Sequence, residues 1–247
     1  MEVFKSITPI IELIDKAKSI VVLTGAGASV ESGIPDFRSP KGIYSQDYVY
    51  RPEKVLSHNF FMNQPKIFYE YYKENIIHTE ALPNPGHIFL AELEKTGKVK
   101  AIVTQNIDGL HQLAGSKNVL EIHGSIYSNH CVRCHEAYNI NYVLNNVDPI
   151  RCLECNGLVK PDVVLYGEAL DNDIVLNAVE EIVKADLLII AGTSLTVYPA
   201  ADLVKYGKKT LLMNLSKTSG DIYFDYVYYG KFGDTCREIQ NKMNKIE

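Results

Sequence analysis

The sequence predicts an α/β fold in which a parallel sheet forms a larger domain and two insertions form a smaller one. The first observation is a series of short apolar runs that end in small or polar residues, as buried parallel strands do: 19–24, 100–104, 163–165, 186–191 and 210–214. The second is that segments with apolar residues three and four positions apart, typical of helices, alternate with these runs: 10–17, 86–95, 172–184 and 233–245. Strands that alternate with helices indicate a parallel α/β sheet.

Two stretches interrupt this alternation and supply the third observation. Residues 40–82 are rich in Tyr and Phe and contain no clear strand, so we expect a helical module there. Residues 123–160 contain four of the five cysteines and are expected to form a small module held together by a metal. We therefore assign residues 1–39, 83–122 and 161–247 to the sheet domain, and the two modules together to the small domain. A chain of 247 residues, 46% of them hydrophobic, is long enough to form one large hydrophobic core and a second, smaller one.

The composition argues against several classes of protein. A formal net charge of -5 offers no basic surface for specific or general binding of nucleic acid. No apolar run approaches the roughly 20 residues that cross a bilayer, and the N-terminal segment MEVFKSITPI lacks the pattern of a signal peptide. We expect a cytoplasmic protein with no membrane association. The sequence leaves the oligomeric state open, with a monomer favoured.

A glycine turn follows the first predicted strand of the sheet. Residues 25–30 read Gly-Ala-Gly-Ala-Ser-Val and precede a helix-compatible stretch, so backbone N–H groups and a helix N-terminus could hold a pyrophosphate. The third glycine of the dinucleotide fingerprint is replaced by Val30, and no acidic residue ends a second strand about 20 residues later. A hydride-transferring dehydrogenase is therefore disfavoured. Because ligands bind at the carboxyl ends of parallel strands, we expect one crevice to gather the loops after Thr24, Thr104, Ala191 and Asn214.

A charged and aromatic segment lies next to the glycine turn. Asp36, Phe37 and Arg38 are consecutive in the sequence. Arg38 could clamp a phosphate and Phe37 could cover a reactive face. A salt bridge within the loop and a core phenylalanine are the alternative.

A second polar loop and a histidine follow farther along the chain. Gln105, Asn106 and Asp108 crowd the loop after the strand that ends at Thr104. His123 ends another short apolar run, in the string Glu-Ile-His-Gly. An imidazole transfers protons near neutral pH, so His123 is a candidate general base, although a single histidine is more often structural.

The four clustered cysteines have the spacing of a zinc ribbon. Cys131-x2-Cys134 and Cys152-x2-Cys155 are separated by 17 residues, so that two knuckles can each donate two thiolates. Four thiolates leave no open coordination position, so we expect the zinc to be structural. Four buried thiols without metal are the alternative.

The residues around these cysteines bear on the kind of module. His130 and His135 adjoin the pairs and could in principle be ligands. The segment between Cys131 and Cys155 contains two basic and three acidic residues. A module that contacts a phosphate backbone should be basic, and this segment is slightly acidic. Cys236 lies outside the pairs and is expected to be a core residue.

Taken together, these motifs resemble those of the sirtuins, in register from Val21 to about Gly230. The matching strings are Gly25–Ser29, Gly33–Arg38, Thr104–His111, Glu121–Gly124, the four-cysteine ribbon, Lys160–Glu168 and Gly192–Pro199. Their order and number make coincidence implausible.

The resemblance implies a Rossmann-like NAD-binding domain, one structural zinc ion and activity as an NAD-dependent protein lysine deacetylase or deacylase. In that reaction the acyl-lysine oxygen attacks the ribose carbon that bears nicotinamide, and nicotinamide and O-acyl-ADP-ribose are released. His123 would deprotonate a ribose hydroxyl so that the acyl group migrates, and Asn106 is the second implied catalytic residue. The implied contacts of NAD are Gly25, Ala26, Gly27, Ser29, Asp36, Phe37, Arg38, Gln105, Asn106, Ile107, Asp108, His123, Gly192, Thr193, Ser194 and Asn214.

The resemblance also describes the second substrate, an acyl-lysine protein or peptide. It would add as a strand, with implied contacts at Val163, Val164, Leu165, Tyr166, Gly167 and Val197. Family members that prefer negatively charged acyl groups carry a Tyr and, three residues later, an Arg, where this sequence has Tyr69 and Tyr72. We therefore expect neutral acyl groups such as acetyl. Mono-ADP-ribosyl transfer and a non-catalytic, nucleotide-binding zinc protein are the alternatives, and His123 counts against the second.

Overall fold

The computed structural model describes residues 1–37, 39–40, 42–45, 48–198, 200–218 and 220–245. Within them, one fully parallel sheet has the strand order β1-β10-β9-β8-β2-β3-β4. Its strands are β1 (Glu2–Phe4), β2 (Ile20–Thr24), β3 (Val99–Thr104), β4 (Val119–Glu121), β8 (Leu187–Ala191), β9 (Thr210–Asn214) and β10 (Tyr226–Tyr229). The order reverses between β2 and β8, which makes this the switch point of a Rossmann-like sheet, as predicted.

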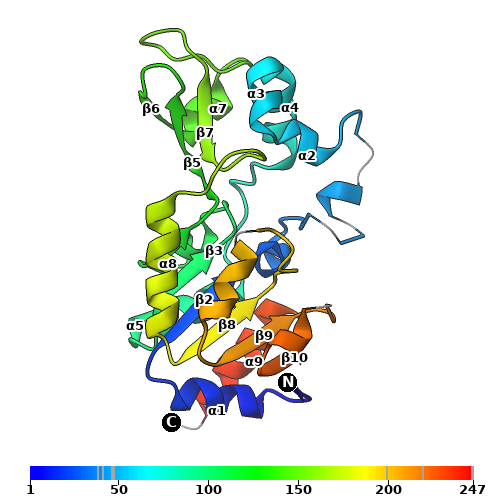
Figure 1. The fold of residues 1–247 in the computed structure, drawn as a ribbon, viewed down its shortest axis with the longest axis vertical. Helices are drawn as coiled ribbons and strands as arrows, with labels where there is room; N and C mark the ends of the chain where they lie inside the picture. Colours follow the sequence, from blue (N-terminus) through cyan, green and yellow to red (C-terminus); the bar gives the residue numbers. More distant parts are fainter. Residues whose placement is uncertain (38, 41, 46–47, 199, 219, 246–247) are drawn as a thin grey trace.

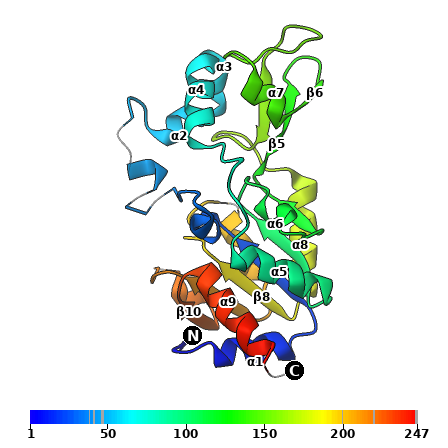
Figure 2. The same ribbon diagram turned by 180° about the vertical axis from the view of Figure 1, so that it is seen from behind.

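Helices cover both faces of this sheet. One face packs against α1 (Thr8–Lys16), α5 (Pro85–Lys95) and α9 (Phe232–Met243). Figure 2 shows α5 and α9 in front of the strands. The other face packs against α8 (Asn172–Lys184) and the 3-10 helix η4 (Ala200–Tyr206), in front of the sheet in Figure 1. The short helix α6 (Leu110–Leu113) follows β3.

The sequence of β2 shows why the central strands read as unbroken apolar runs. All five residues of Ile20–Thr24 are buried. Ile20 and Val22 belong to the core on the α1 side, whereas Val21 and Leu23 belong to the core on the α8 side. Because side chains alternate between the two faces of a strand and both faces are covered, neither set can be polar.

The helices α8 and α5 each begin at a side chain that accepts free N–H groups of the first turn. The Asp171 carboxylate accepts from the N–H groups of Asp173 and Ile174 at the start of α8, at 2.9 and 3.2 Å. At the start of α5, the Asn84 side chain accepts from Gly86 N at 2.9 Å, and His87 Nδ1 accepts from Asn84 N at 3.3 Å.

The two insertions lie together at one end of the molecule (Figure 1). Residues 40–82 form α2 (Pro52–Val55), α3 (His58–Asn63) and α4 (Pro65–Asn75), and residues 123–160 contribute to an antiparallel sheet of order β6-β5-β7 and the helix α7 (Ile140–Asn145). The strands are β5 (Gly124–Cys131), β6 (Ala137–Asn139) and β7 (Val159–Val163).

A separate hydrophobic core joins the helices to this small sheet. Phe61, Phe68, Tyr69 and Tyr72 are fully buried in it and make edge-to-face and stacked contacts with one another. The Tyr69 hydroxyl donates to the carbonyl of Val159 in β7, which ties α4 to the small sheet. The exact domain boundaries assigned from the sequence stay a prediction.

The structure corrects two expectations about local structure. Residues 163–165 are not a strand of the parallel sheet, because Val163 ends β7 of the small antiparallel sheet instead. The glycine turn is not followed by the N-terminus of a helix suited to a phosphate. Two 3-10 turns follow it, η1 (Ala26–Ala28) and η2 (Val30–Ser32), and further 3-10 turns are η3 (Ile43–Ser45) and η5 (Asp221–Tyr223). In the described part of the chain, no helix has the length and apolar character to cross a membrane.

Candidate active site

A cleft of about 1330 Å³ lies at the carboxyl ends of β2, β3, β8 and β9. Ala26, Gln105, Gly192 and Leu215, which come from the four loops after these strands, all line it. The expected convergence of these loops is therefore confirmed. The opposite wall comes from the helical module and from the segment that follows β7, including Tyr72 and Val164.

The cleft gathers the residues that the sequence predicts to bind NAD and the acyl-lysine substrate, with two exceptions. Gly25 does not line the cleft but supports the residues that do, and Arg38 lies outside the described residues. The predicted residues that line the cleft are Ala26, Gly27, Ser29, Asp36, Phe37, Gln105, Asn106, Ile107, Asp108, His123, Val163, Val164, Leu165, Tyr166, Gly167, Gly192, Thr193, Ser194, Val197 and Asn214. Their individual roles in binding or catalysis stay a prediction.

The glycine turn packs directly against the loop after β8. Gly27 N donates to the carbonyl of Gly192 at 2.7 Å, and Gly25 N donates to the carbonyl of Ala191 at 3.1 Å. A Cβ on Gly27 would lie 2.8 Å from Gly192 Cα, and one on Gly192 would lie 2.2 Å from Ala28 N. Only glycine allows this approach, and Gly192 also has a φ of +61°.

A row of hydrogen bonds forms the polar floor of the cleft. The Asn106 Nδ2 atom donates to Gly25 O at 3.1 Å and to Ser29 Oγ at 3.0 Å. Ser29 Oγ in turn donates to Asp108 Oδ2 at 2.6 Å, and Asp108 Oδ1 accepts from Leu110 N at 2.9 Å. Asn106, Ser29 and Asp108 are all buried, so this floor is fixed before any ligand enters.

A second pair of polar side chains fixes the loop after β8. Thr193 N donates to Asn214 Oδ1 at 3.1 Å, and Asn214 Nδ2 donates to Thr193 O at 2.9 Å. Gln105 Nε2 donates to Thr193 Oγ1 at 3.2 Å. The loops after β3, β8 and β9 are therefore held to one another by side-chain amides.

His123 lies at the wall of the cleft with one ring nitrogen engaged. Its Nδ1 atom is 3.0 Å from the carbonyl oxygen of Gln105. Because a carbonyl oxygen can only accept, Nδ1 carries the proton and Nε2 of the neutral ring has a free lone pair. Burial lowers the pKa of His123, and the bond to Gln105 opposes this shift. The ring is therefore neutral near pH 7 and able to accept a proton at Nε2.

The segment after β7 is anchored on both sides. Val164 N donates to the carbonyl of His123 at 2.9 Å, and Tyr166 N donates to the carbonyl of Leu56 at 2.9 Å. Leu165 N donates to the Glu168 carboxylate at 2.8 Å. This segment therefore connects the histidine loop to the helical module.

Several residues that hold the site together were missed by the sequence reasoning. Glu168 also bonds His58 Nδ1 at 2.7 Å and Lys160 Nζ at 3.0 Å. Glu31 accepts from Gly233 N at 2.5 Å and Asp234 N at 3.1 Å, which places its carboxylate at the N-terminus of α9. Both partners of Glu31 are about 200 residues distant in sequence, so no local pattern could reveal the contact.

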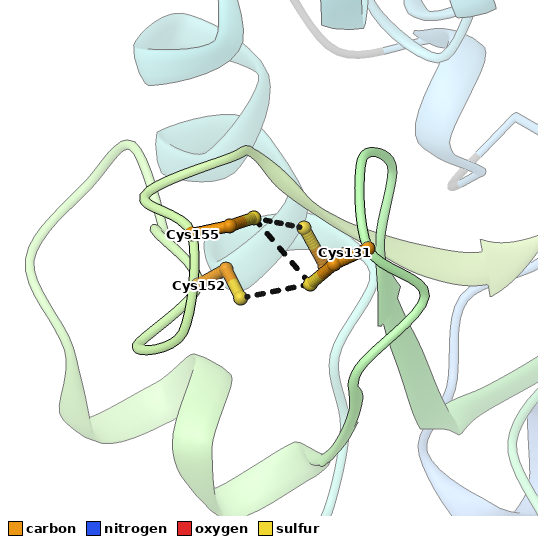
Figure 3. Close-up of side chains that lie close together, drawn as sticks. Cys131, Cys152 and Cys155 are labelled. Atoms are coloured by element: carbon orange, nitrogen blue, oxygen red, sulfur yellow. Dashed lines mark hydrogen bonds between the residues drawn. The ribbon is translucent and has the colours of Figure 1, made fainter.

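The four cysteines form one cluster in the small module. Figure 3 labels three of them, Cys131, Cys152 and Cys155. The sulfur atoms of all four lie within 4.8 Å of one another, and none forms a disulfide. Zinc–sulfur bonds of about 2.3 Å would place tetrahedral thiolates roughly 3.8 Å apart, so the cluster fits one structural zinc ion. Among the described residues, His130 is not part of this cluster and pairs with Asp162 at 2.5 Å.

The two cysteine pairs have the same local geometry. His135 N donates to Cys131 O at 3.0 Å, and Asn156 N donates to Cys152 O at 3.0 Å. His135 and Asn156 have φ angles of 63° and 58°, in the left-handed region that closes each turn. Because this turn is repeated in both pairs, the four sulfur atoms lie close enough together to bind one metal ion.

A doubly wound parallel sheet, a polar cleft at its switch point and a four-thiolate cluster define a nucleotide-binding α/β protein with a structural zinc site. The model of the Sir2 family matches residues 25–199, and the chain belongs to this family, the sirtuins. It is 49% identical over 233 residues to an NAD-dependent protein deacetylase of Clostridium perfringens, with 92% of this chain and 96% of the relative covered.

Solved Sir2 structures have the same fold over almost the whole chain. A Sir2 complex with a p53 peptide and NAD+ superimposes with a TM-score of 0.87 at 38% identity, covering 97% of this chain and 99% of that chain. A Sir2 variant with a deacetylated p53 peptide and 3′-O-acetyl-ADP-ribose gives a TM-score of 0.89 at 37% identity, covering 98% of each chain.

Proposed function

We propose that this protein is an NAD-dependent protein lysine deacetylase that transfers the acyl group to ADP-ribose. The observation that carries the proposal is His123, whose Nδ1–H is fixed on Gln105 while its ring lines the cleft shared by the glycine turn and the segment after β7. Relatives named as NAD-dependent protein deacetylases, at 49% identity in the case of Clostridium perfringens, support it.

The cleft has the volume and the polar floor that NAD requires. Gly27, Gly192 and Ser194 would lie along the dinucleotide, with the amide side chains of Gln105 and Asn214 holding their loops in place. Bound NAD supplies a ribose carbon whose bond to nicotinamide breaks, and ribose hydroxyls that accept the acyl group.

The polar floor would orient the end of the cofactor that reacts. Asp108 would hold the nicotinamide carboxamide, while Asn106 and Ser29 would lie near the ribose. His123 would accept a proton from a ribose hydroxyl at Nε2. Phe37 is partly buried against the aromatic core and would cover the site from water.

The acyl-lysine substrate would bind beside the segment that follows β7 and opposite Val197. The N–H groups of Val164, Leu165 and Tyr166 already donate to protein acceptors. Backbone pairing with a substrate strand would therefore use other groups of this segment, such as the N–H of Gly167 and the carbonyl of Val164. Hydrogen bonds to the substrate backbone do not distinguish between side chains, which supports a broad range of substrate proteins.

The acyl group would lie against an apolar wall that includes Tyr72, Ile76 and Leu165. Burial raises the pKa of the Tyr72 hydroxyl, which keeps the phenol neutral. A carboxylate placed here would meet no arginine among the described residues of the cleft wall, so the site favours neutral acyl groups.

The test is nicotinamide release from NAD in the presence of an acetyl-lysine peptide, with the same peptide carrying free lysine as the control. Release that depends on the acetyl group, with deacetylated peptide as product, is the expected result. Release accompanied by ADP-ribosylated protein and no deacetylation would favour mono-ADP-ribosyl transfer instead. No release with either peptide would favour a non-catalytic nucleotide-binding protein. A cytoplasmic location and a monomeric state are part of the same proposal, and fractionation and sedimentation test them.

A further inference from the structure

A buried chain of side-chain hydrogen bonds lies beneath the cleft, at the carboxyl ends of β2 and β3. Thr24 and Thr104 are opposite each other in the two strands, and Thr24 Oγ1 donates to Thr104 Oγ1 at 2.9 Å. The His111 Nε2 atom lies 2.9 Å from Thr24 Oγ1. All three side chains are buried, with His111 1% exposed.

The direction of this chain fixes the tautomer of His111. Thr24 uses its only proton on Thr104, so its oxygen can only accept from His111. His111 therefore carries its proton on Nε2, and its Nδ1 is a buried acceptor without a partner among the described residues. The centroid of the His111 ring lies 4.8 Å from the centroid of the His87 ring. The Nδ1 atom of His87 accepts from Asn84 N.

Burial keeps both histidines uncharged. It lowers the pKa of His87 to about 4, with the nearby Asp108 carboxylate opposing the shift. It lowers the pKa of His111 well below its ordinary value, and His87 adds to this shift. The direction of the hydrogen bonds from His111 to Thr24 and from Thr24 to Thr104 is therefore the same throughout the neutral pH range.

The other end of the chain reaches the polar floor of the cleft. Asn106 N donates to Thr104 Oγ1 at 3.0 Å, so the Thr104 oxygen accepts from both Thr24 and the backbone of Asn106. Rotation of the Thr104 side chain to another rotamer would move Oγ1 away from these two donors. The direction of the Asn106 side chain toward Gly25 O and Ser29 Oγ follows from this fixed backbone.

We propose that His111 is a positioning residue, which acts through Thr24 and Thr104 to hold Asn106 where the reaction needs it. His111 does not line the cleft, so it acts only through this chain. The inference rests on the proposed function, because that function gives Asn106 its place beside the ribose. A small displacement of a positioned group costs turnover more than it costs binding.

Thr24→Val tests the link, because valine keeps the branched shape and removes the hydroxyl. We expect kcat to fall on the order of ten-fold or more, with KM for NAD and peptide nearly unchanged. Thr24→Ser keeps the hydroxyl and should restore kcat. The matched control is Thr210→Val. Thr210 is also buried in the sheet, but its hydroxyl bonds Asp225 at the opposite end of β9, so Tm should fall without a loss of kcat.

A double-mutant cycle tests whether His111 acts through Thr24. His111→Leu should lower kcat as Thr24→Val does, and the double variant should lose little more than either single one. Losses in kcat that multiply, or variants with a lowered Tm and unchanged kcat, would overturn the inference.

Hydrogen exchange at the Asn106 amide provides a readout that does not depend on turnover. Exchange should be faster in Thr24→Val and His111→Leu, and unchanged in Thr210→Val. Unchanged exchange in the first two variants overturns the inference even where the wild-type protein is active. A wild-type protein with no deacetylase activity but this exchange pattern would contradict the proposed function and support the link.

Discussion

Ser29 Oγ donates to Asp108 Oδ2 at 2.6 Å, and this bond joins the glycine turn to the loop after β3. The two residues are 79 positions apart in the sequence and both are buried. Ser29 also accepts from Asn106 Nδ2, so its hydroxyl is used as both donor and acceptor. The floor of the cleft therefore depends on a carboxylate at position 108.

Asp108→Asn should weaken the binding of NAD by about ten-fold. The amide oxygen of the new asparagine can keep the bond to Leu110 N. The NH2 group of the asparagine then faces Ser29 Oγ, which already accepts from Asn106. The Ser29 proton then loses its acceptor. Isothermal titration calorimetry with NAD measures the change, with Asp225→Asn as a control remote from the cleft. Equal affinities of wild type and Asp108→Asn would contradict this role of the carboxylate.

His123→Ala should remove most turnover while leaving the fold and the zinc content intact. General base catalysis contributes about 10²- to 10⁴-fold, so kcat should fall by that order. The side chain is only partly buried and bonds one carbonyl, so the loss in Tm should be small. Steady-state kinetics, metal analysis and thermal unfolding measure the three quantities. An active His123→Ala protein would show that another group accepts the proton.

The pKa of His123 sets the acid limb of the pH profile. Burial lowers this pKa from 6.5, so the neutral form that acts as base persists below pH 6.5. We expect kcat/KM to fall with decreasing pH along a limb whose midpoint lies below 6.5. In the same range the unfolded chain binds the proton first, so the free energy of unfolding also decreases as the pH falls through 6.5. A limb centred above 6.5 would contradict a lowered pKa.

The parts of the fold that the sequence predicts are those buried on both sides. β2, β3, β8 and β9 read as apolar runs because helices cover both faces of the sheet. β1 and β10 lie at one edge, are short and carry exposed or half-exposed residues, so they give no such run. An apolar run also does not say which sheet it joins, which is why Val163 was assigned to the wrong one.

The site was predictable where neighbouring residues carry the chemistry, as in the loop 104–108 and the two cysteine pairs. It was not predictable where the contact depends on tertiary register. The pairing of Thr24 with Thr104 requires the register of β2 against β3. The helix expected after the glycine turn is absent because η2 ends at Ser32. Its C-cap Gly33 reverses the chain with a φ of +89°, and Pro35 follows two residues later.

Cys131→Ser should release the zinc and unfold the small module. The cluster draws two sulfur atoms from each of two distant turns, so loss of one thiolate leaves an incomplete tetrahedron. Cys236→Ser is the matched control, because Cys236 is equally buried but lies on α9, outside the cluster. We expect a large fall in Tm and in bound zinc for Cys131→Ser alone. Retention of one equivalent of zinc by that variant would contradict a four-thiolate site.

The purified protein should remove acetyl groups at least about 100-fold more efficiently than succinyl groups. Tyr72 is fully buried where the acyl group would lie, and its hydroxyl has no hydrogen-bond partner among the described residues. A neutral phenol can donate one hydrogen bond to a carboxylate but cannot neutralise its charge, so much of the desolvation cost remains.

Matched acetyl-lysine and succinyl-lysine peptides, compared by kcat/KM at saturating NAD, measure this preference. Tyr69→Phe serves as the control variant, since the Tyr69 hydroxyl is directed to the Val159 carbonyl and Tyr69 does not line the cleft. That variant should keep the preference for acetyl while losing some stability, because the Val159 carbonyl is left without its donor. Desuccinylation as efficient as deacetylation by the wild-type protein would mean that a cation, outside the wall that Tyr72 forms, reaches the acyl carboxylate.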